Sequence, residues 1–244
     1  MPRYFIEVAY KGTAYAGFQV QQNANTVQDE VEKALSIYFK AGFELTGSSR
    51  TDAGVHAQQN FFHFDFSFSE EPPWDKVVYH LNAILPPDIV CKRIFRVGNE
   101  AHSRFDALYR TYEYSLYMLK DPFKEDRAFF YPYKLDLDDL NAAAAIVEAE
   151  ADFESFSKRN TQVRTFQCTI RESHWFMNND ILVYHVSGNR FLRGMVRGLV
   201  GTMLKVGRSK MSVEEFKAVI HSHDQSLVDF SVPAHGLTLI EVAY

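Results

Sequence analysis

Apolar and polar residues alternate along several short stretches of the chain, which is the pattern of β-strands with one buried face. The clearest stretch runs from Phe62 to Phe68, where phenylalanine at every second position alternates with histidine, aspartate and serine. Weaker stretches predict further strands at residues 3–10, 43–46, 89–97, 111–119, 165–176, 181–187 and 237–242. The polar residues 178–180 separate two of these and predict a tight turn within a hairpin.

Between the strands, apolar residues recur three and four positions apart, as they do on the buried face of an α-helix. This spacing predicts helices at residues 26–40, 74–83, 136–150 and 190–206, and one more after Ser212. Asn25 and Asn189 stand where their side chains can cap the first and the fourth of these helices. Ser212 and Glu215 form the pattern of a capping box at the start of the last helix.

The predicted strands and helices follow a similar order in the two halves of the chain. This order predicts an α+β fold made of two related halves, each with a largely antiparallel sheet flanked by helices. We place the N-terminal domain at residues 1–104 and the C-terminal domain at residues 105–244. A cleft between two such halves is a natural place for an active site.

Composition places the chain among ordinary globular proteins, with 244 residues, 46% hydrophobic and 23% charged. No stretch reaches the ~18 consecutive apolar residues of a membrane-spanning helix, and the chain enters its first predicted strand without a secretion signal. Cys91 and Cys168 are the two cysteines, too few for a disulfide framework or a cysteine zinc site. We therefore expect a cytoplasmic protein that does not associate with membranes.

Charge is distributed unevenly, although the net charge of the whole chain is only −5. Residues 158–210 carry ten lysines and arginines against two acidic residues, a net charge of +8, whereas residues 1–157 are at −9 and residues 211–244 at −4. A basic segment in an acidic protein can face a polyanion such as a nucleic acid. A solvated basic helix face is the alternative interpretation.

Two familiar types of site are excluded or disfavoured by the residues present. Gly12 and Gly17 have the spacing of a phosphate-binding loop, but Phe18 and Gln19 follow where that loop needs Lys and Ser or Thr. His221 and His223 are two positions apart, which does not place both on one face of a helix. We interpret them as exposed surface residues and predict no metal site.

The segment around Asp52 has the composition of a chemical site. Arg50 and Asp52 are two positions apart, so in an extended segment they project from the same side. Ala53 and Gly54 keep the neighbouring backbone small and leave room for a bulky planar ligand. From these residues alone, Asp52 is a candidate nucleophile, a metal ligand or the anchor of an Asx turn.

Residues 50–57, Arg-Thr-Asp-Ala-Gly-Val-His-Ala, closely resemble the active-site signature of the tRNA pseudouridine synthase A family. Other stretches similar to that family follow in order along nearly the whole chain, at residues 10–19, 26–28, 102–107, 110–114, 152–156, 191–197 and 236–239. There are two departures: Ser49 stands where the family usually has Gly, and Phe18 where it usually has Trp. Ser49 puts the local backbone conformation in question, because Ser tolerates positive φ less well than Gly.

The resemblance implies isomerisation of uridine to pseudouridine, with Asp52 as the nucleophile and Arg197 as its basic partner. Arg50 is implied to help hold the target nucleotide out of the RNA helix, since a guanidinium can stack and bind phosphate together. Tyr112 is implied to stack on the flipped uracil; core packing is the alternative for this residue. For Arg197 the alternative is a plain basic helix face, which Arg190 and Arg193 would share by their spacing.

The resemblance also implies the substrate and the assembly. The substrate is the anticodon arm of tRNA at positions 38 to 40, and two copies of the chain form a homodimer that holds one tRNA. No cofactor is needed, because the base leaves, rotates and reattaches within one water-poor pocket. Either Leu237 or Leu239 is expected to wall that pocket, and whether Asp52 attacks the ribose or the base stays open.

Two other functions fit the same residues. One is a non-catalytic RNA-binding module in which Asp52 is structural, and the other is a metal-assisted hydrolase that uses Asp52 together with histidines.

Overall fold

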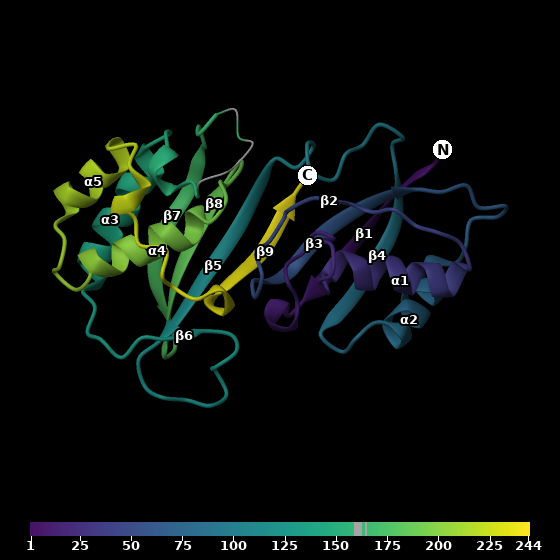
Figure 1. The fold of residues 1–244 in the computed structure, drawn as a ribbon, viewed down its shortest axis with the longest axis horizontal. Coiled ribbons are helices and arrows are strands. Elements are labelled where there is room, and N and C mark those ends of the chain that lie inside the picture. The colour runs from purple at the N-terminus through teal and green to yellow at the C-terminus, as the bar shows by residue number, and fades with distance from the viewer. Residues whose placement is uncertain (159–162, 164) are drawn as a thin grey trace. The chain divides into compact units, whose positions relative to one another are not determined.

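The computed structural model describes residues 1–158, 163 and 165–244, and the chain divides into two compact units (Figure 1). The first unit is Met1–Leu108 together with Leu239–Tyr244, and the second is Tyr109–Thr238. The predicted limits of 1–104 and 105–244 assign the last residues of the chain to the second half. In the structure these residues belong to the first unit, because the final strand runs beside a strand of that unit.

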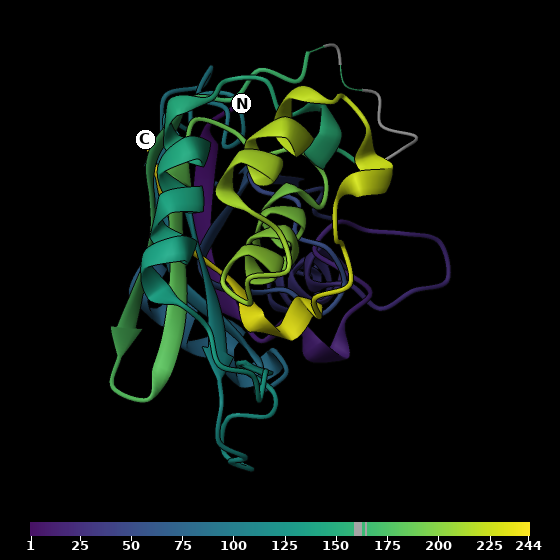
Figure 2. The ribbon, with the colours of Figure 1, turned by 90° about the vertical axis from the view of Figure 1, so that its left-hand side faces the viewer.

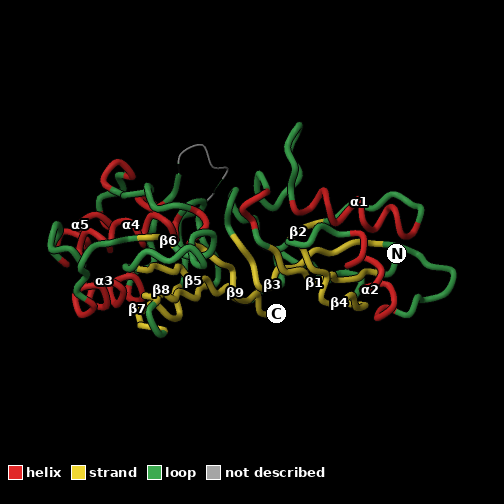
Figure 3. Tube along the Cα trace, turned by 90° about the horizontal axis from the view of Figure 1, so that it is seen from below, coloured by secondary structure: helices red, strands yellow, loops and turns green. Residues whose placement is uncertain are grey.

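The first unit is built on a sheet with the strand order β4-β1-β3-β9, in which β1 pairs antiparallel with both β3 and β4. Its strands are β1 (Arg3–Tyr10), β2 (Thr46–Gly47), β3 (His56–Asp65), β4 (Ile89–Val97) and residues 239–243 of β9 (Leu237–Ala243). Its helices are α1 (Val27–Phe39) and α2 (Trp74–Ile84). Figure 3 shows α1 on one side of the strands. Every second residue of β1 is apolar and buried, so burial of this face against the helices stabilises the unit.

Three sequence predictions in this unit need correction. Thr26, and not Asn25, caps α1: its side chain accepts a hydrogen bond from the backbone N–H of Asp29. The strand predicted at residues 43–46 is reduced to Thr46–Gly47, because only these two residues pair with β3. Strand β3 begins earlier than the phenylalanine alternation and ends at Asp65, since Phe66 and Phe68 pack instead in an aromatic cluster with Phe39.

The second unit has an antiparallel sheet with the order β5-β8-β7, and the short β6 pairs in parallel with β5. The strands are β5 (Tyr109–Tyr117), β6 (Phe129–Phe130), β7 (Ile170–Asn178) and β8 (Ile181–Gly188), and the helices are α3 (Leu137–Ala149), α4 (Met195–Val206) and α5 (Val213–His221). Figure 2 shows the three helices side by side. The predicted hairpin is confirmed, with β7 and β8 joined by Asn179 and Asp180.

The start of α4 corrects the prediction of a helix over residues 190–206. Gly194 precedes the helix with a φ of 75°, a left-handed conformation that favours glycine and interrupts a right-handed helix. Arg190 and Arg193 therefore lie outside the helix, and the predicted basic face that they were to share with Arg197 is wrong. The capping box of Ser212 and Glu215 is confirmed at the start of α5.

Apart from the short β6, which lies between β5 and α3, the two units share the order strand, helix, strand, strand, helix. In each unit, the first strand pairs antiparallel with the second of the two strands that follow the helix. These pairs are β1 with β3 and β5 with β8. Strands β3 and β8 in turn pair with β2 and β7. The predicted α+β fold of two related halves with largely antiparallel sheets is confirmed. Within the described part of the chain, no helix has the length and apolar character needed to cross a membrane.

Candidate active site

Asp52 lies in the segment that connects β2 to β3 in the first unit. Exposure alternates along this segment: Ser49 and Thr51 are buried, whereas Arg50 is exposed and Asp52 is half-buried. This alternation is typical of an extended backbone, whose successive side chains point to opposite sides. Arg50 and Asp52 thus turn toward solvent from the same segment, and Thr51 turns toward the core.

The backbone on both sides of Asp52 is held by hydrogen bonds. The N–H of Phe18 donates to the carbonyl of Thr51 at 3.1 Å, and the N–H of Val55 donates to the carbonyl of Asp52 at 3.2 Å. The Asn60 side chain accepts from the N–H of Ser49 at 3.2 Å and donates to the carbonyl of Ser49 at 2.8 Å. The position of the Asp52 Cα is consequently fixed by groups from three separate parts of the chain.

Two glycines allow this segment to pack closely. A Cβ on Gly12 would lie 2.0 Å from the carbonyl oxygen of Val55, a distance that excludes any side chain there. Gly54 has a φ of 82°, which lets the chain reverse directly after Asp52. The N–H of Gly12 also donates to Nδ1 of the buried His56 at 3.0 Å, so the 10–19 loop and the Asp52 segment are joined side by side.

The carboxylate of Asp52 contrasts with its well-bonded backbone. Among the residues of the first unit, all of which are described, none forms a hydrogen bond or an ion pair with this carboxylate. Arg50 donates instead to Oε1 of Gln19 at 3.2 Å. A carboxylate that is rigidly placed and left without a local partner is available to react with a ligand.

The two departures from the resembled family are accommodated locally. Phe18 is buried, and its ring stacks on that of Phe62 with centroids 4.4 Å apart and an interplanar angle of 9°. Ser49 does not adopt a positive φ, so a residue with a side chain is tolerated there. Its Oγ is nevertheless buried and has no hydrogen-bond partner among the described residues.

Tyr112 lies in β5 of the second unit, opposite Val186 of β8. Its side chain is buried, and its ring meets that of Phe191 edge to face with centroids 5.2 Å apart. Tyr114 lies on the same face of the strand and donates to the carbonyl of Pro233 at 2.8 Å. The aromatic ring of Tyr112 is therefore held in a defined orientation in the second unit.

Arg197 lies in the first turn of α4 and is half-buried. Its Nε and Nη2 both donate to the carbonyl of Val232, at 2.9 and 2.6 Å. This pair of bonds fixes the plane of the guanidinium, and an arginine has five N–H donors, so three are not used in these bonds. Burial raises the pKa of the Tyr114 phenol, and the charge of Arg197 opposes that rise.

Among the described residues, the other basic members of this segment lie in loops, in β7 and in α4. Arg193 is exposed, and its carbonyl accepts a hydrogen bond from the N–H of Lys158 at 3.1 Å. The ammonium of Lys158 lies over the ring of Phe230, with Nζ 5.8 Å from the ring centroid. Arg159 and Arg164 belong to the predicted basic segment but lie outside the described residues.

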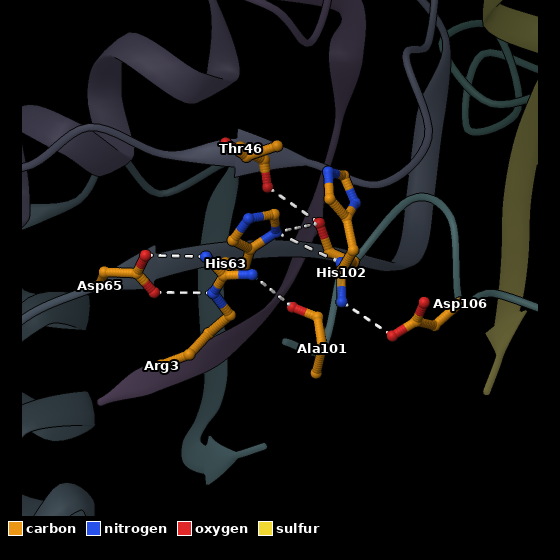
Figure 4. A network of polar contacts seen from close by, with 8 residues as sticks. Arg3, Thr46, His63, Asp65, Ala101, His102 and Asp106 are labelled. Carbon is orange, nitrogen blue, oxygen red and sulfur yellow. Dashed lines mark hydrogen bonds and ion pairs between the residues drawn. The ribbon is translucent and has the colours of Figure 1, made fainter. Parts of the chain in front are cut away.

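Residues 102–107, another stretch of the family resemblance, are anchored on the sheet of the first unit (Figure 4). Oγ of Ser103 lies 2.8 Å from Nδ1 of the buried His63 and 3.0 Å from the carbonyl of Thr46. Arg3 forms two 2.7 Å hydrogen bonds with Asp65 and a third, of 2.9 Å, with the carbonyl of Ala101. Ser103 thus attaches the stretch to β2 and β3, and the preceding Ala101 is bound to Arg3 of β1.

The other predicted pocket residues belong to β9. Leu237 and Leu239 are both buried and lie two positions apart, so they share one face of the strand. Leu237 belongs to the second unit and Leu239 to the first. Of the four main site residues, Arg50 and Asp52 are in the first unit, and Tyr112 and Arg197 are in the second.

A possible metal-binding group is present away from these residues. Among the described residues, ligand atoms of Asp152, Glu154 and His223 lie within 4.8 Å of one another. His223 is exposed, as predicted, and its Nδ1 is 2.9 Å from a carboxylate oxygen of Glu154. The group does not include Asp52, so it gives no support to a hydrolase in which Asp52 holds a metal.

Sequence reasoning missed two residues beneath the Asp52 segment, Tyr10 and Asn60. The Tyr10 hydroxyl lies 2.8 Å from Oγ1 of Thr51 and accepts from Nδ2 of Asn60 at 3.2 Å. Their signal in the sequence is weak: Asn60 is a polar residue next to a run of buried aromatic residues.

Known proteins match this chain along its whole length. A family model described as tRNA pseudouridine synthase matches residues 6–106 and 143–244. The chain is 42% identical to the tRNA pseudouridine synthase A of Parabacteroides distasonis, over 100% of this chain and 96% of that protein. It is also 42% identical to the protein of that name from Porphyromonas gingivalis, over 100% and 98%, and 36% identical to the one from Staphylococcus aureus, over 98% and 91%. The chain therefore belongs to the tRNA pseudouridine synthase family.

Proposed function

We propose that this chain converts uridine to pseudouridine at positions 38 to 40 of the anticodon arm of tRNA, with Asp52 as the nucleophile. The reaction class and the tRNA substrate follow from the family. The single observation that carries the assignment of Asp52 is the contrast described above: its backbone is fixed on both sides, and its carboxylate is unpaired within its own unit. Rigid placement of a nucleophile lowers the entropic cost of reaching the transition state.

Tyr112, Arg197 and Arg50 complete the proposed set. Tyr112 offers an aromatic ring on which a flipped uracil stacks, and Phe191 holds its orientation. Arg197 has its guanidinium plane set by Val232, which leaves donors directed elsewhere for a carboxylate or a phosphate. Arg50 is exposed close to Asp52. There its planar guanidinium can occupy the position that the flipped nucleotide leaves in the RNA helix, or bind the phosphate backbone of the RNA.

The proposed chemistry proceeds without a cofactor. The N-glycosidic bond of the target uridine breaks, the uracil turns, and a carbon–carbon bond forms between the same ribose and C5 of the base. The proton from C5 is lost and the ring nitrogen gains one, so the product is an isomer of the substrate and no external group or electron is consumed.

The charge distribution supports tRNA as the partner. Residues 158–210 have a net charge of +8 in a chain whose total is −5. Neutralisation of RNA phosphates releases counterions and gives affinity without reading the base sequence. This suits an enzyme that recognises the shape of many tRNAs. We place such an enzyme in the cytoplasm.

We also propose that the chain acts as a homodimer. On the second unit, Phe123 and Leu119 are 89% and 82% exposed, which is unusual for large apolar side chains. An apolar hollow in the same unit is lined by Met118, Tyr133, Leu135, Leu137 and Met177. Exposed apolar surface of this kind supports self-association. Light scattering of wild type and of Phe123→Asp measures whether the chain forms a dimer and whether this surface is needed for it.

The function is tested by incubating the protein with unmodified tRNA transcripts and mapping pseudouridine along the product. We expect pseudouridine at positions 38, 39 or 40 and at no position outside the anticodon arm. Binding of tRNA without any pseudouridine would instead favour the non-catalytic RNA-binding module.

A further inference from the structure

Asn60 is a fully buried side chain in β3, with 0% of its surface exposed. Its amide uses all its hydrogen-bonding capacity. Oδ1 accepts from the N–H of Ser49 and from the N–H of Phe61, at 3.2 and 2.9 Å. Nδ2 donates to the carbonyl of Ser49 and to the Tyr10 hydroxyl, at 2.8 and 3.2 Å. Since an amide group offers two donors and accepts through two lone pairs, its orientation is fully determined.

Tyr10 continues this network toward Asp52. It is the last residue of β1, its side chain is buried, and its hydroxyl lies 2.8 Å from Oγ1 of Thr51. Strand pairing places Tyr10 opposite Ala57 of β3, so the sheet itself brings this hydroxyl under the Asp52 segment. The network thus reaches the segment at two points, through the backbone of Ser49 and through the side chain of Thr51.

We propose that Asn60 and Tyr10 are positioning residues for Asp52, acting through Ser49 and Thr51. The two contact points are the buried residues of an alternating segment, and the residues between and after them are Arg50 and Asp52. Holding the inward side chains sets the direction of the outward ones. This inference rests on the proposed function, because it assigns Asn60 and Tyr10 a role in the reaction that Asp52 is proposed to perform.

The expected size of the effect follows from the geometry of nucleophilic attack. A productive geometry needs the nucleophile within about 0.5 Å of its optimum, and a displacement of about 1 Å costs roughly 100-fold in rate. Loss of a hydrogen bond directly before Asp52 in sequence allows movement on this scale. A network that only stabilised the unit would change the melting temperature and leave the turnover number unaltered.

The test uses Tyr10→Phe, Thr51→Val and the double variant in the full-length protein, because each substitution removes a hydroxyl and keeps the shape. Turnover at saturating tRNA and the KM for tRNA are measured separately. We expect each single variant to lose roughly tenfold to 100-fold in turnover with KM changed by less than about threefold. We expect the double variant to lose much less than the product of the two single losses, because both hydroxyls form one hydrogen bond.

Tyr184→Phe is the matched control. Tyr184 is fully buried in β8, and its hydroxyl lies 2.9 Å from Oγ of Ser173, so the substitution also removes one buried hydrogen bond. We expect it to lower stability and leave turnover unchanged. Multiplicative losses in the double variant, or a turnover for Tyr10→Phe equal to that of Tyr184→Phe, would overturn the positioning role.

Failure of the proposed function is recognised separately, because the wild-type protein would then form no pseudouridine. In that case, amide hydrogen exchange at Ser49 and Val55 still measures whether Tyr10 holds the segment. Faster exchange at both amides in Tyr10→Phe than in Tyr184→Phe is the expected result. Equal exchange in the two variants overturns the inference without reference to activity.

Discussion

The backbone N–H of Ser103 donates a hydrogen bond to Nδ1 of His63 at 3.2 Å, which identifies Nδ1 as an unprotonated acceptor. Burial lowers the pKa of His63 to about 4, and the nearby charges of Arg3 and His102 act in the same direction. The carboxylates of Asp65 and Asp106 oppose this shift without reversing it. A neutral imidazole therefore anchors residues 102–107 to the sheet.

This neutral histidine makes the protein sensitive to acid. An unfolded histidine has a pKa near 6.5, so between about pH 6.5 and pH 4 the unfolded state binds the proton that folded His63 excludes. The contribution of His63 to the free energy of unfolding is complete above that pH range and is lost as the pH falls through it. The free energy of unfolding falls by about 2 kcal/mol across the range, once partial screening by solvent is allowed for. Denaturant unfolding of wild type and of His63→Asn, which keeps an acceptor near Nδ1, should show the steeper pH dependence in wild type. Parallel curves would contradict the assignment.

His185, in the second unit, should give stability the opposite dependence on pH. Its hydrogen bond to Glu113 raises its pKa, burial opposes this, and the charge of Glu172 adds to the rise. The two ring nitrogens each lie 3.2 Å from a carboxylate oxygen, one of Glu113 and one of Glu172. The stabilisation by His185 is complete below the pKa that this histidine has in the unfolded state. It is lost as the pH rises through the higher pKa that His185 has in the folded state. The melting-temperature advantage of wild type over His185→Gln should shrink as the pH rises above the pKa of about 6.5 of an unfolded histidine, and an advantage that grows would refute this.

Arg197 is expected to act on turnover more than on binding. Lysine cannot reproduce the two bonds that its Nε and Nη2 make to Val232, so Arg197→Lys and Arg197→Ala should both lower turnover by about 100-fold. The Kd for tRNA should stay within about threefold, measured by filter binding. Arg193→Ala is the control, because Arg193 is exposed in the same basic segment and should weaken binding in a salt-dependent way. Equal losses of turnover and affinity in the Arg197 variants would reduce Arg197 to a phosphate contact.

Ser49 should be a site where removal of a polar group stabilises the protein. Its Oγ is buried without a partner among the described residues, and an unsatisfied buried hydroxyl is unfavourable. Ser49→Ala should therefore raise the free energy of unfolding by about 1 kcal/mol. Ser103→Ala provides the contrast, since its hydroxyl contacts His63 and the Thr46 carbonyl and its removal should lower stability. A loss of stability in Ser49→Ala would show that its hydroxyl has a partner in solution.

The sequence predicted the elements whose limits are set by side-chain pattern. Strands β1 and β4 were predicted to the residue, because turn-forming residues mark one end of each, Lys11-Gly12 after β1 and Pro86-Pro87 before β4. The start of α4 was missed, because the apolar spacing continues upstream while Gly194 takes a left-handed conformation that spacing does not reveal. The cap at Thr26 was missed by one residue, since Asn25 and Thr26 are both good capping residues.

In the candidate site, too, some residues were predicted from the sequence and others were not. Asp52 and Arg50 were identified by local composition together with the family resemblance, both of which are properties of a short segment. Asn60 and Tyr10 were not identified, because strand pairing across the sheet brings them beneath Thr51. A contact of this kind depends on the register between strands that are distant in sequence, and periodicity within each strand does not determine that register.

Comparison of wild type with Asp52→Asn and Asp52→Ala tests whether Asp52 is the nucleophile. Each protein is incubated with tRNA labelled at uridine, the nucleosides are separated, and the Kd for the same tRNA is measured in parallel. We predict no pseudouridine above background for either variant, with a Kd within about threefold of wild type, because the carboxylate reacts while other groups bind the RNA. Pseudouridine formed by Asp52→Ala at a rate near that of wild type would show that Asp52 is not the nucleophile.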